Sequence, residues 1–322
     1  MTSRTEPAAQ VDEPRTATAA QVDVVVVAYN CPADVERLLT DLEHAPEVAH
    51  VVVVDHGDGT SSDLAERRGF VTERVPSNPG FGAGQNRGVD RTSAEFVLLL
   101  NPDATMEPGA LEIGVATLLA EPDVAAVEGV IRNRHTGAPE RSGGSALRPV
   151  HLLGRATGAA TLARVPGVRA AMRHVAPLAD WAERAPDVGR QVEALSATAL
   201  LVRRSAFAQV GGFDESFFLY GEDIDLSRRW GARGYRLLSL PVPWATHDDG
   251  STSAGWWERE LRWFQGSLHY GCRWWSTPQY ALALVAAAVM ATRLTVHRPT
   301  AWRSAWSTLV ALPTRERFRR PT

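Results

Sequence analysis

A group of five carboxylates lies among aromatic residues in the segment Gly211–Trp230, GGFDESFFLYGEDIDLSRRW, called here the acidic segment. Apolar surroundings raise the pKa of a carboxyl group and a nearby metal ion lowers it, so closely spaced acids can divide the roles of base, orienting group and ligand. A solvated helix start over Asp223–Gly231 is the alternative, because acids in a first turn favour the helix dipole and an Asp–Arg pair four residues apart would add to it. The acidic segment alone supports both interpretations. The five acids are Asp214, Glu215, Glu222, Asp223 and Asp225.

Another acid stands at the end of an apolar run. Leu98–Ala104 reads LLLNPDA, which is typical of a buried strand that stops at a proline and presents Asp103 at its end. A carboxylate at such a strand end can hold a divalent cation that bridges a diphosphate, because hard oxygen ligands suit magnesium and manganese. A simple Asn-Pro-Asp turn explains the same residues, and taken singly it is the better interpretation.

The loop Pro76–Gly88, PSNPGFGAGQNRG, combines four glycines with Asn78 and Asn86. Glycines let backbone amides approach a ligand closely, and the positive end of a following helix suits a diphosphate. The loop departs from a dinucleotide-binding fingerprint, because Gln85 occupies the place of the third glycine and the loop follows the third expected strand. It therefore indicates either a phosphate-binding loop or an ordinary tight turn.

The elements that must position these groups are short β-branched runs that alternate with helices. This alternation predicts a doubly wound α/β protein with buried parallel strands. Ligands of such sheets collect at the carboxyl ends of the strands. The polar residues at those ends are Tyr29, Asn30, Asp55, Asn101 and Asp103. The expected strands are 22–29, 50–55, 70–75 and 95–100, and the expected helices are 33–43, 63–68 and 83–91.

Composition narrows the class of protein. The net charge of -3 over 322 residues argues against a general nucleic-acid binder, which needs a broad basic face. The two cysteines, Cys31 and Cys272, have neither disulfide-framework nor zinc-ligand spacing, which fits a reducing compartment. Residues 1–20 are polar and rich in Ala, Pro and Thr, and are expected to form a disordered lead-in rather than a signal peptide.

In their order along the chain, these motifs resemble glycosyltransferase family 2, and more narrowly its bacterial rhamnosyltransferase-like branch. The resemblance covers residues 22–253. Each motif alone is only modestly specific for the family, but the motifs in this order are together highly specific. The pieces are a first strand ending in Tyr29-Asn30, VVVVD ending at Asp55, NPGFGAGQNRG, LLLNPDA, LVRRSAFAQVGGFDESFFLYGEDIDLSRR, and a later His247 with GSTS.

The resemblance implies a GT-A fold, in which a Rossmann-like, mostly parallel central sheet is flanked by helices. It also implies an inverting transfer of a sugar from a nucleotide diphosphate donor. By analogy Asp55 holds the nucleotide base, and Asn78 and Asn86 border the sugar diphosphate. The donor-binding residues implied in this way are Tyr29, Asn30, Asp55, Asn78, Gly82, Asn86, Asn101 and Asp103.

The same resemblance implies a metal site and a base. Asp103 corresponds to the last acid of the family's DXD motif, Asn101 replaces the first acid, and His247 corresponds to a late ligand of Mn²⁺ or Mg²⁺. Asp223 corresponds to the catalytic base of the Glu-Asp motif and Glu222 to the neighbour that positions the acceptor. The chemistry agrees, because inversion needs a base for the acceptor hydroxyl and a cation for the departing diphosphate.

The sequence departs from the family pattern at three places. His56 replaces the usual asparagine after the base-binding acid. Ser196–Thr198 stands where Ser-Gly-Ala or Ser-Gly-Ser is common, which would alter the acceptor side of the pocket. Asp248 and Asp249 follow the implied metal-binding histidine and would add to its ligands or compete with them.

The expected organisation is a GT-A domain over residues 21–253 and a helical, Trp- and Arg-rich extension over 254–322. Residues 132–193 are expected to form a variable excursion over the acceptor side. The most apolar run of the extension, Ala281–Thr292, is shorter than the roughly 20 residues that span a bilayer. From Arg293 onward, seven arginines minus one glutamate give +6. Aromatic residues beside a basic tail suit a membrane surface, and a helix pair packed on the domain or a homodimer interface are the alternatives.

Three functions follow from these patterns. The first is a metal-dependent, inverting transferase acting on a lipid-linked or cell-envelope glycan, in the cytoplasm and peripheral on the inner face of the cell membrane. For its donor, the branch suggests deoxythymidine diphosphate rhamnose (dTDP-rhamnose). The second keeps the enzyme and changes the acceptor to a soluble natural product. The third is a nucleotide-sugar-binding protein without catalysis, against which the intact Asp103, Asp223 and His247 argue.

Overall fold

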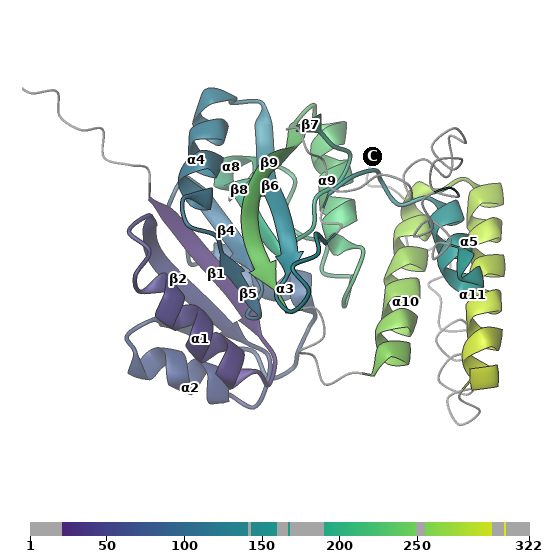
Figure 1. The fold of residues 1–322 in the computed structure, drawn as a ribbon, viewed down its shortest axis with the longest axis horizontal. Helices are drawn as coiled ribbons and strands as arrows, with labels where there is room; N and C mark the ends of the chain where they lie inside the picture. Colours follow the sequence, from purple (N-terminus) through teal and green to yellow (C-terminus); the bar gives the residue numbers. More distant parts are fainter. Residues whose placement is uncertain are drawn as a thin grey trace, which may run out of the picture.

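The computed structural model describes residues 21–140, 143–159, 167, 190–248, 255–297 and 306. Within them, nine strands form one sheet in the order β3-β2-β1-β4-β8-β6-β9-β5, with β7 paired to β9 (Figure 1). The strands are β1 (Val22–Ala28), β2 (Val48–Asp55), β3 (Val71–Arg74), β4 (Phe96–Leu100), β5 (Ala104–Met106), β6 (Val124–Asn133), β7 (Arg190–Gln191), β8 (Ala199–Arg203) and β9 (Arg236–His247). The helices are α1 (Pro32–Leu42), α2 (Thr60–Arg67), α3 (Phe81–Val89), α4 (Ala110–Ala120), α5 (Pro149–Thr157), α8 (Arg204–Gln209), α9 (Glu222–Ala232), α10 (Trp256–Trp274) and α11 (Thr277–His297).

Most strands of the sheet run in one direction. β3, β2, β1 and β4 are parallel neighbours, and β6 is parallel to β9. Because β8 lies antiparallel between β4 and β6, these two groups of strands point the same way. Only β8, β5 and β7 run against them among the described strands. The expected mostly parallel sheet is confirmed, and the carboxyl ends of β1, β2, β4 and β9 lie along one edge.

Two apolar cores cover the two faces of the sheet, because successive side chains of a strand point to opposite faces. On β1, Val24 and Val26 pack into the core that includes side chains of α1 and α4. Val25 packs into the other core with Leu226 and Trp230 of α9. Burial of one such valine contributes about 1.5–3 kcal/mol to stability, so an unbroken run of valines specifies a strand covered on both faces.

Helices begin earlier than the sequence patterns predict, at glycines with left-handed backbone. Gly59 (φ 93°) precedes α2 and Gly80 (φ 111°) precedes α3. Helix α9 spans Glu222–Ala232 rather than Asp223–Gly231 and follows Gly221 (φ 91°). Glycine adopts these angles at little steric cost, so the chain can turn and start a helix within one residue.

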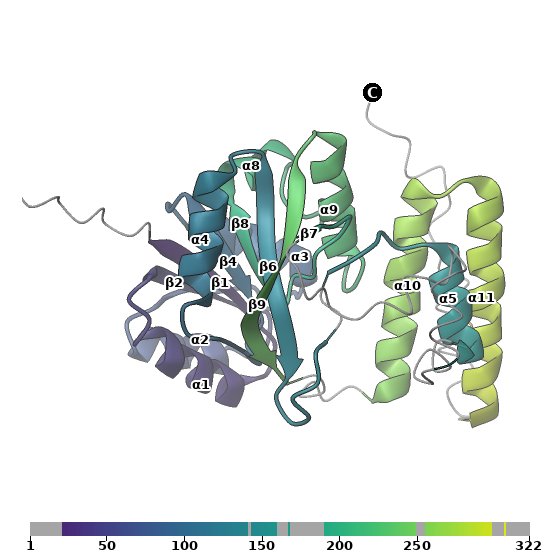
Figure 2. The same cartoon turned by 45° about the horizontal axis from the view of Figure 1, so that its top comes forward.

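Helices α5, α10 and α11 form a helical layer beyond α9 (Figure 2). A third core joins Leu152 of α5, Leu268 of α10 and Met290 of α11. Phe217 of the acidic segment belongs to the same core. The helical layer and the acidic segment therefore share one packed interior.

Helix α11 is longer than the sequence patterns predict. It has 21 residues, and its part Thr277–Val296 is long and apolar enough to cross a membrane by length and composition. The expectation of a run too short to do so, Ala281–Thr292, is wrong, because Gln279 and Arg293 lie within the helix instead of ending it. Only 33% of its apolar window is buried. Length and composition alone do not distinguish a membrane span from a helix of a soluble protein.

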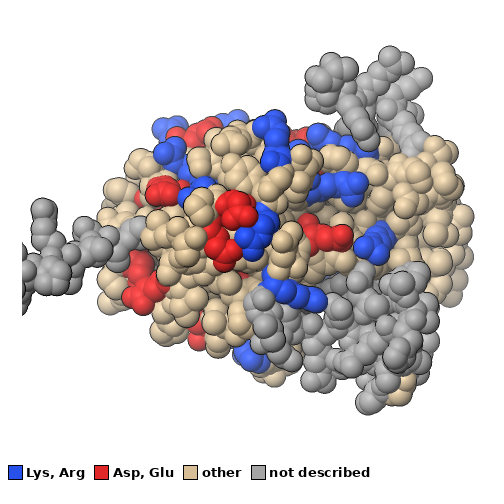
Figure 3. Space-filling model, turned by 90° about the horizontal axis from the view of Figure 1, so that it is seen from above, with Lys and Arg blue, Asp and Glu red and all other residues tan. Residues whose placement is uncertain are grey.

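Charged side chains of both signs are mixed on the described surface of the face seen in Figure 3. Several of the chain's acids are paired with arginine, for example Glu121 with Arg236 at 2.8 Å and Glu43 with Arg68 at 2.6 Å. Exposed pairs of this kind contribute little to stability, about 0–1 kcal/mol each. The mixture agrees with a net charge close to zero for a chain of this length.

Some sequence expectations fall outside the described residues. These are the lead-in over 1–20, Asp249 and the GSTS sequence at 250–253, and most of the basic tail. Of the expected excursion over 132–193, the described parts include α5 and β7. The division of the chain at residues 253 and 254 stays a prediction.

Candidate active site

The acidic segment contains a tight turn that starts helix α9. Tyr220 (φ 68°) and Gly221 (φ 91°) both have left-handed backbone. A non-glycine residue adopts this conformation at a cost, and such residues are concentrated at functional sites. The turn places Glu222 and Asp223 in the first turn of α9, where the helix dipole favours a carboxylate.

Glu222 and Asp223 are a coupled pair of acids. Burial raises the pKa of Glu222 to about 8, and the charge of Asp223 adds to the shift. Burial also raises the pKa of Asp223, against hydrogen bonds from the backbone of Ile224 and Ala197. Oε2 of Glu222 has no hydrogen-bond partner within the described residues. Since two such groups titrate as a pair and backbone amides stabilise charge on Asp223, we assign the shared proton at neutral pH to Glu222.

The loop Ser196–Thr198 links this pair to the end of β4. The backbone of Ala197 hydrogen-bonds to the Asp223 carboxylate. At the other side, the N–H of Asn101 donates to the carbonyl oxygen of Thr198 at 2.9 Å. Asp223, the proposed base, and Asn101 at the end of β4 thus both hydrogen-bond to this short loop.

Asp103 and His247 meet at the carboxyl edge of the sheet. Oδ1 of Asp103 lies 3.3 Å from Nε2 of His247. Pairing of β5 with β9 sets Ala104 opposite His247 and fixes this approach. Burial lowers the pKa of His247, but the hydrogen bonds and charges of Asp103 and Glu140 outweigh it and raise the pKa to about 9. The two carboxylates therefore favour the protonated form of the imidazole.

Asp103 and His247 fit a divalent cation. Two ligand atoms about 2.1 Å from one ion and at right angles to each other lie about 3.0 Å apart. The observed 3.3 Å, which is also the distance of the ion pair between the two side chains, is compatible with this value. Within the described residues, no group of three or more His, Cys, Asp or Glu side chains could hold a metal ion. Mg²⁺ and Mn²⁺ accept one or two protein ligands when water and phosphate oxygens supply the rest, so the pair suits a cation shared with a diphosphate.

The expected base pocket lies at the ends of β1 and β2. Asp55 is buried, and its two oxygens accept hydrogen bonds from the N–H of Gly57 in the following loop at 2.8 Å and from the N–H of Ser62 in the first turn of α2 at 2.9 Å. Asn30 has left-handed backbone (φ 51°), and Tyr29 is 59% exposed. The structure brings these three residues together, and Asp55 also shapes the loop. Each carboxylate oxygen can accept a second hydrogen bond, so this contact does not use up its capacity for a base.

The glycine-rich loop packs against the acidic segment. A Cβ atom on Gly80 would lie 2.6 Å from the carbonyl oxygen of Phe218, and one on Gly82 would lie 2.8 Å from Cβ of Phe213. Nδ2 of Asn86 donates to the carbonyl oxygen of Phe213 at 2.9 Å, and its Oδ1 accepts from the N–H of the same residue at 2.8 Å. Gly82 and Asn86 thus hold the acidic segment on α3, and their contact with a donor stays a prediction.

His56 lies buried beneath the same loop. Burial lowers the pKa of His56, while a hydrogen bond to the side chain of Asn78 opposes the shift. A Cβ atom on Gly84 would lie 2.7 Å from Cε1 of the imidazole. Asn78 itself has left-handed backbone (φ 41°). The histidine that replaces the usual asparagine therefore supports the loop from within.

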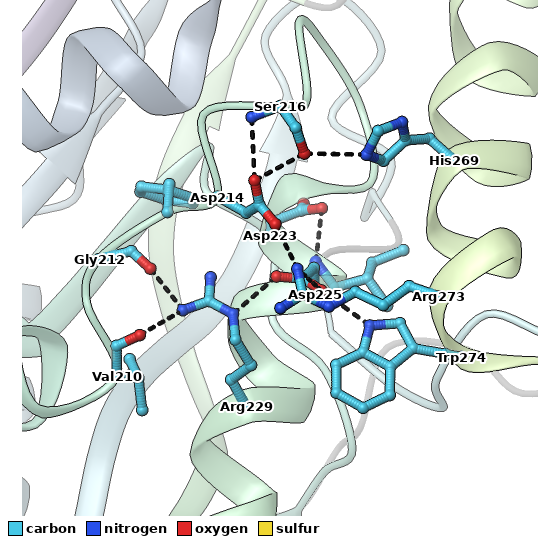
Figure 4. Close-up of polar contacts among 12 residues, drawn as sticks. Val210, Gly212, Asp214, Ser216, Asp223, Asp225, Arg229, His269, Arg273 and Trp274 are labelled. Atoms are coloured by element: carbon cyan, nitrogen blue, oxygen red, sulfur yellow. Dashed lines mark hydrogen bonds and ion pairs between the residues drawn. The ribbon is translucent and has the colours of Figure 1, made fainter. Parts of the chain in front are cut away.

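Helix α10 also supports the acidic segment, which the sequence patterns did not indicate. The carboxylate of Asp225 is fully buried and accepts from Nε of Arg229 and from Nε1 of Trp274, both at 2.7 Å (Figure 4). The first contact is the i,i+4 pair expected on α9. From α10, Arg273 also forms an ion pair with Asp214. The end of α10 is thus bonded to both sides of the proposed base.

The backbones of α10 and the acidic segment approach closely at Gly266. A Cβ atom at this position would lie 1.9 Å from the carbonyl oxygen of Tyr220 and 2.9 Å from that of Leu219. Ser216 and His269 hydrogen-bond beside this contact at 2.9 Å. An isolated glycine inside a helical pattern often has a packing reason, and this was the signal in the sequence that could have revealed the contact.

Comparison with known proteins agrees with this arrangement. The family model described as glycosyltransferase-like family 2 matches residues 19–266, a range that ends at Gly266 in α10. The chain is 31% identical over 292 residues to the N-acetylglucosaminyl-diphospho-decaprenol L-rhamnosyltransferase of Mycobacterium tuberculosis, with 76% of this chain and 89% of that protein covered. It is 22% identical over 253 residues to the poly-beta-1,6-N-acetyl-D-glucosamine synthase of Staphylococcus aureus, with 76% of this chain and 54% of that protein covered.

Solved structures show the same fold. The mannosyltransferase PcManGT of Pyrobaculum calidifontis, in complex with GDP-Man and Mn²⁺, matches with a TM-score of 0.50 at 20% identity, over 91% of this chain and 85% of that one. GalNAc-T7, with UDP, GalNAc and Mn²⁺, matches with a TM-score of 0.57 at 13% identity, over 92% of this chain and 58% of that one. Both support the GT-A fold expected from the sequence. The chain belongs to glycosyltransferase family 2.

Proposed function

We propose that this glycosyltransferase is metal-dependent and inverting, and that it moves L-rhamnose from dTDP-rhamnose to a hydroxyl of a lipid-linked or cell-envelope glycan. The M. tuberculosis relative supports the donor and acceptor classes, since its name gives both a rhamnosyl group and a decaprenol-linked acceptor. The Mn²⁺ in the two similar structures supports the metal. The observation that carries the proposal is that the loop Ser196–Thr198 hydrogen-bonds to Asp223 on one side and to Asn101 on the other, two residues before Asp103, which lies beside His247.

The proposed base is Asp223. Asp223 is less buried than Glu222, and its carboxylate would take the proton of the acceptor hydroxyl as that oxygen attacks the anomeric carbon. Glu222, buried beside it, holds a proton and would orient the acceptor by donating a hydrogen bond. Single displacement of this kind inverts the anomeric carbon and needs no covalent nucleophile from the protein.

The leaving group would be received at the other end of the site. Asp103 and Nε2 of His247 would hold Mn²⁺ or Mg²⁺, which supplies positive charge against the departing diphosphate. Metal binding would require Nε2 of His247, which faces Asp103, to be free of its proton. Tyr29, Asn30 and Asp55 would hold the nucleotide base.

The donor is tested by a thermal-shift panel of dTDP-rhamnose, UDP-N-acetylglucosamine and GDP-mannose, each with and without Mn²⁺. We expect dTDP-rhamnose with Mn²⁺ to give the largest rise in Tm, because a ligand that binds only the folded state adds RT ln(1 + [L]/Kd) to stability. A larger rise with another nucleotide sugar would reassign the donor. Binding without transfer to any glycan acceptor would favour the non-catalytic alternative.

Asp103→Ala should abolish the Mn²⁺-dependent part of that rise in Tm and leave the metal-free part unchanged. The reason is that Asp103 lies at a strand end and contributes one of two protein ligands, so its removal affects the cation and not the core. The Tm of the ligand-free variant serves as the control for folding. An unchanged Mn²⁺ effect would remove Asp103 from the metal site.

Helix α11 is the proposed contact with the membrane at the inner face of the cell. Its outward side carries Leu282, Val285, Val289 and Val296, which are 38–72% exposed. The arginine-rich sequence that follows would meet anionic lipid headgroups. A surface contact of this kind would bring the active site to a lipid-linked acceptor.

Val285→Glu combined with Val289→Glu should weaken binding to vesicles that contain anionic lipid by about tenfold or more, because burying one valine is worth about 1.5–3 kcal/mol. Co-sedimentation of the full chain at low salt measures the effect. Leu119→Glu is the matched control, since Leu119 is an equally exposed apolar residue on α4. If the wild-type protein ignores such vesicles, the membrane contact is wrong and a soluble acceptor becomes the leading alternative. In that case, a molecular mass in solution that rises with protein concentration would favour a dimer interface on α11.

A further inference from the structure

His247 has a second partner, on the side of its ring that faces away from Asp103. Nδ1 of His247 lies 2.9 Å from Oε2 of Glu140. Both side chains are mostly buried, with 14% of His247 and 24% of Glu140 exposed. The imidazole is therefore bound through both nitrogens, each to a different carboxylate. The sequence patterns did not indicate Glu140, since it lies in the arginine- and glycine-rich stretch after β6.

A short hairpin fixes Glu140 in this place. The N–H of Glu140 donates to the carbonyl oxygen of Ile131 at 2.9 Å, which folds the chain back on the end of β6. Nδ2 of Asn133 donates to the other carboxylate oxygen of Glu140 at 3.3 Å. Asn133 is in register with His247 across the β6–β9 pair. Backbone pairing thus sets the acid and the imidazole at a constant separation.

We propose that Glu140 is a positioning residue for the metal site: it accepts the Nδ1–H hydrogen bond of His247 and so keeps Nε2 aimed at the cation that Asp103 also binds. A histidine that binds a metal through one nitrogen commonly donates the N–H of the other to a carboxylate, which fixes the ring and raises its basicity. Glu140 supplies this acceptor, and Asn133 holds it in turn. The inference rests on the proposed role of His247 as a metal ligand.

The test measures Mn²⁺ affinity of the full chain directly, by the loss of the free Mn²⁺ signal in electron paramagnetic resonance, with and without dTDP. Glu140→Ala should weaken Mn²⁺ binding by about 10–100-fold, the usual cost of losing such a partner. Glu140→Gln should recover part of the affinity, because its side-chain oxygen can still accept from Nδ1–H, although its NH2 group then faces Nδ2 of Asn133 and the 3.3 Å contact there is lost. Affinity for dTDP without metal should not change in either variant.

Arg132→Ala is the control for the hairpin itself. Arg132 braces the same hairpin through a 3.1 Å hydrogen bond to the carbonyl oxygen of Gly137, and the hydrogen bonds and ion pairs of the His247 side chain in the described structure are to Asp103 and Glu140. If Arg132→Ala weakens Mn²⁺ as much as Glu140→Ala, or if Glu140→Gln recovers nothing, Glu140 is only a structural brace and the inference is wrong. If Glu140→Ala is unfolded in circular dichroism, Glu140→Gln decides, and a Mn²⁺ affinity higher than that of His247→Ala is expected for it.

His247→Ala separates this inference from the proposed function. If His247→Ala weakens Mn²⁺ binding and Glu140→Ala does not, the metal site stands and the role of Glu140 is overturned. If neither His247→Ala nor Asp103→Ala affects Mn²⁺ binding, the proposed metal site itself is wrong. Parallel losses for His247→Ala and Glu140→Ala, with recovery by Glu140→Gln, support both.

Discussion

Asp223→Asn should lower the rate of sugar transfer by at least about 10²–10⁴-fold, the usual cost of losing a general base, while donor affinity stays nearly constant. The amide has the size of the carboxylate and can keep the hydrogen bond from the N–H of Ile224, which is 2.8 Å in the native protein. It cannot accept the proton of the acceptor hydroxyl. Single-turnover transfer measured beside donor binding separates the two effects.

Glu222→Gln is the matched variant. Because Glu222 is assigned the shared proton, glutamine resembles its native form and should leave the chemical step largely intact. Its effect should fall mainly on the KM for the acceptor, where lost ground-state binding appears. If Asp223→Asn kept near-normal transfer while Glu222→Gln lost it, the base would be Glu222. If both kept activity, the acidic segment would be no more than a helix start.

Gly266→Ala should lower transfer by about 10²-fold, although Gly266 lies on α10 and carries no reactive group. The added Cβ atom would lie 1.9 Å from the carbonyl oxygen of Tyr220, which is backbone and cannot move aside alone. Either α10 or the turn that starts α9 must shift, and a displacement of about 1 Å at a reacting group can cost this much rate. Transfer rate and Tm should be measured together.

Gly231→Ala is the control for this substitution. Gly231 lies inside α9, and a Cβ atom there would meet nothing within 4 Å. Alanine is the better helix former by about 0.8–1.0 kcal/mol, so this variant should be as active as the wild type and equally stable or more stable. Full activity of Gly266→Ala would show that α10 does not determine the position of the proposed base.

The four parallel strands β1 to β4 and the residues at their ends could be predicted from the sequence because their signals are local, whereas β5 to β9 were not among the expected strands. Val24, Val25 and Val26 belong to an unbroken β-branched run, and this pattern has one common structural solution. Asp103 and His247 were assigned to a metal site by the order of the family motifs, and in the structure Oδ1 of Asp103 lies 3.3 Å from Nε2 of His247.

The partners of the acidic segment were not predictable, because they come from distant parts of the chain. Asn86 is of a residue type that could bind the sugar donor, yet its side-chain amide is hydrogen-bonded to the backbone of Phe213. Trp274 suggested a membrane surface by composition, yet its indole N–H bonds to the buried Asp225. A residue type indicates which bonds a side chain can form, while the fold decides with which partner it forms them.

The contact between α10 and the acidic segment can form only late in synthesis, because α10 follows all the described strands in the chain. Trp274 lies 27 residues after His247, the last residue of β9. At a synthesis rate of about 5–20 residues per second, this distance corresponds to about 1–5 s. During that interval the described strands and the donor-side loops have already been made, while Asp225 still lacks its bond from α10. A ribosome-bound chain that stops before α10 would therefore bind donor before it could transfer sugar, and catalysis would be the last property that the growing protein acquires.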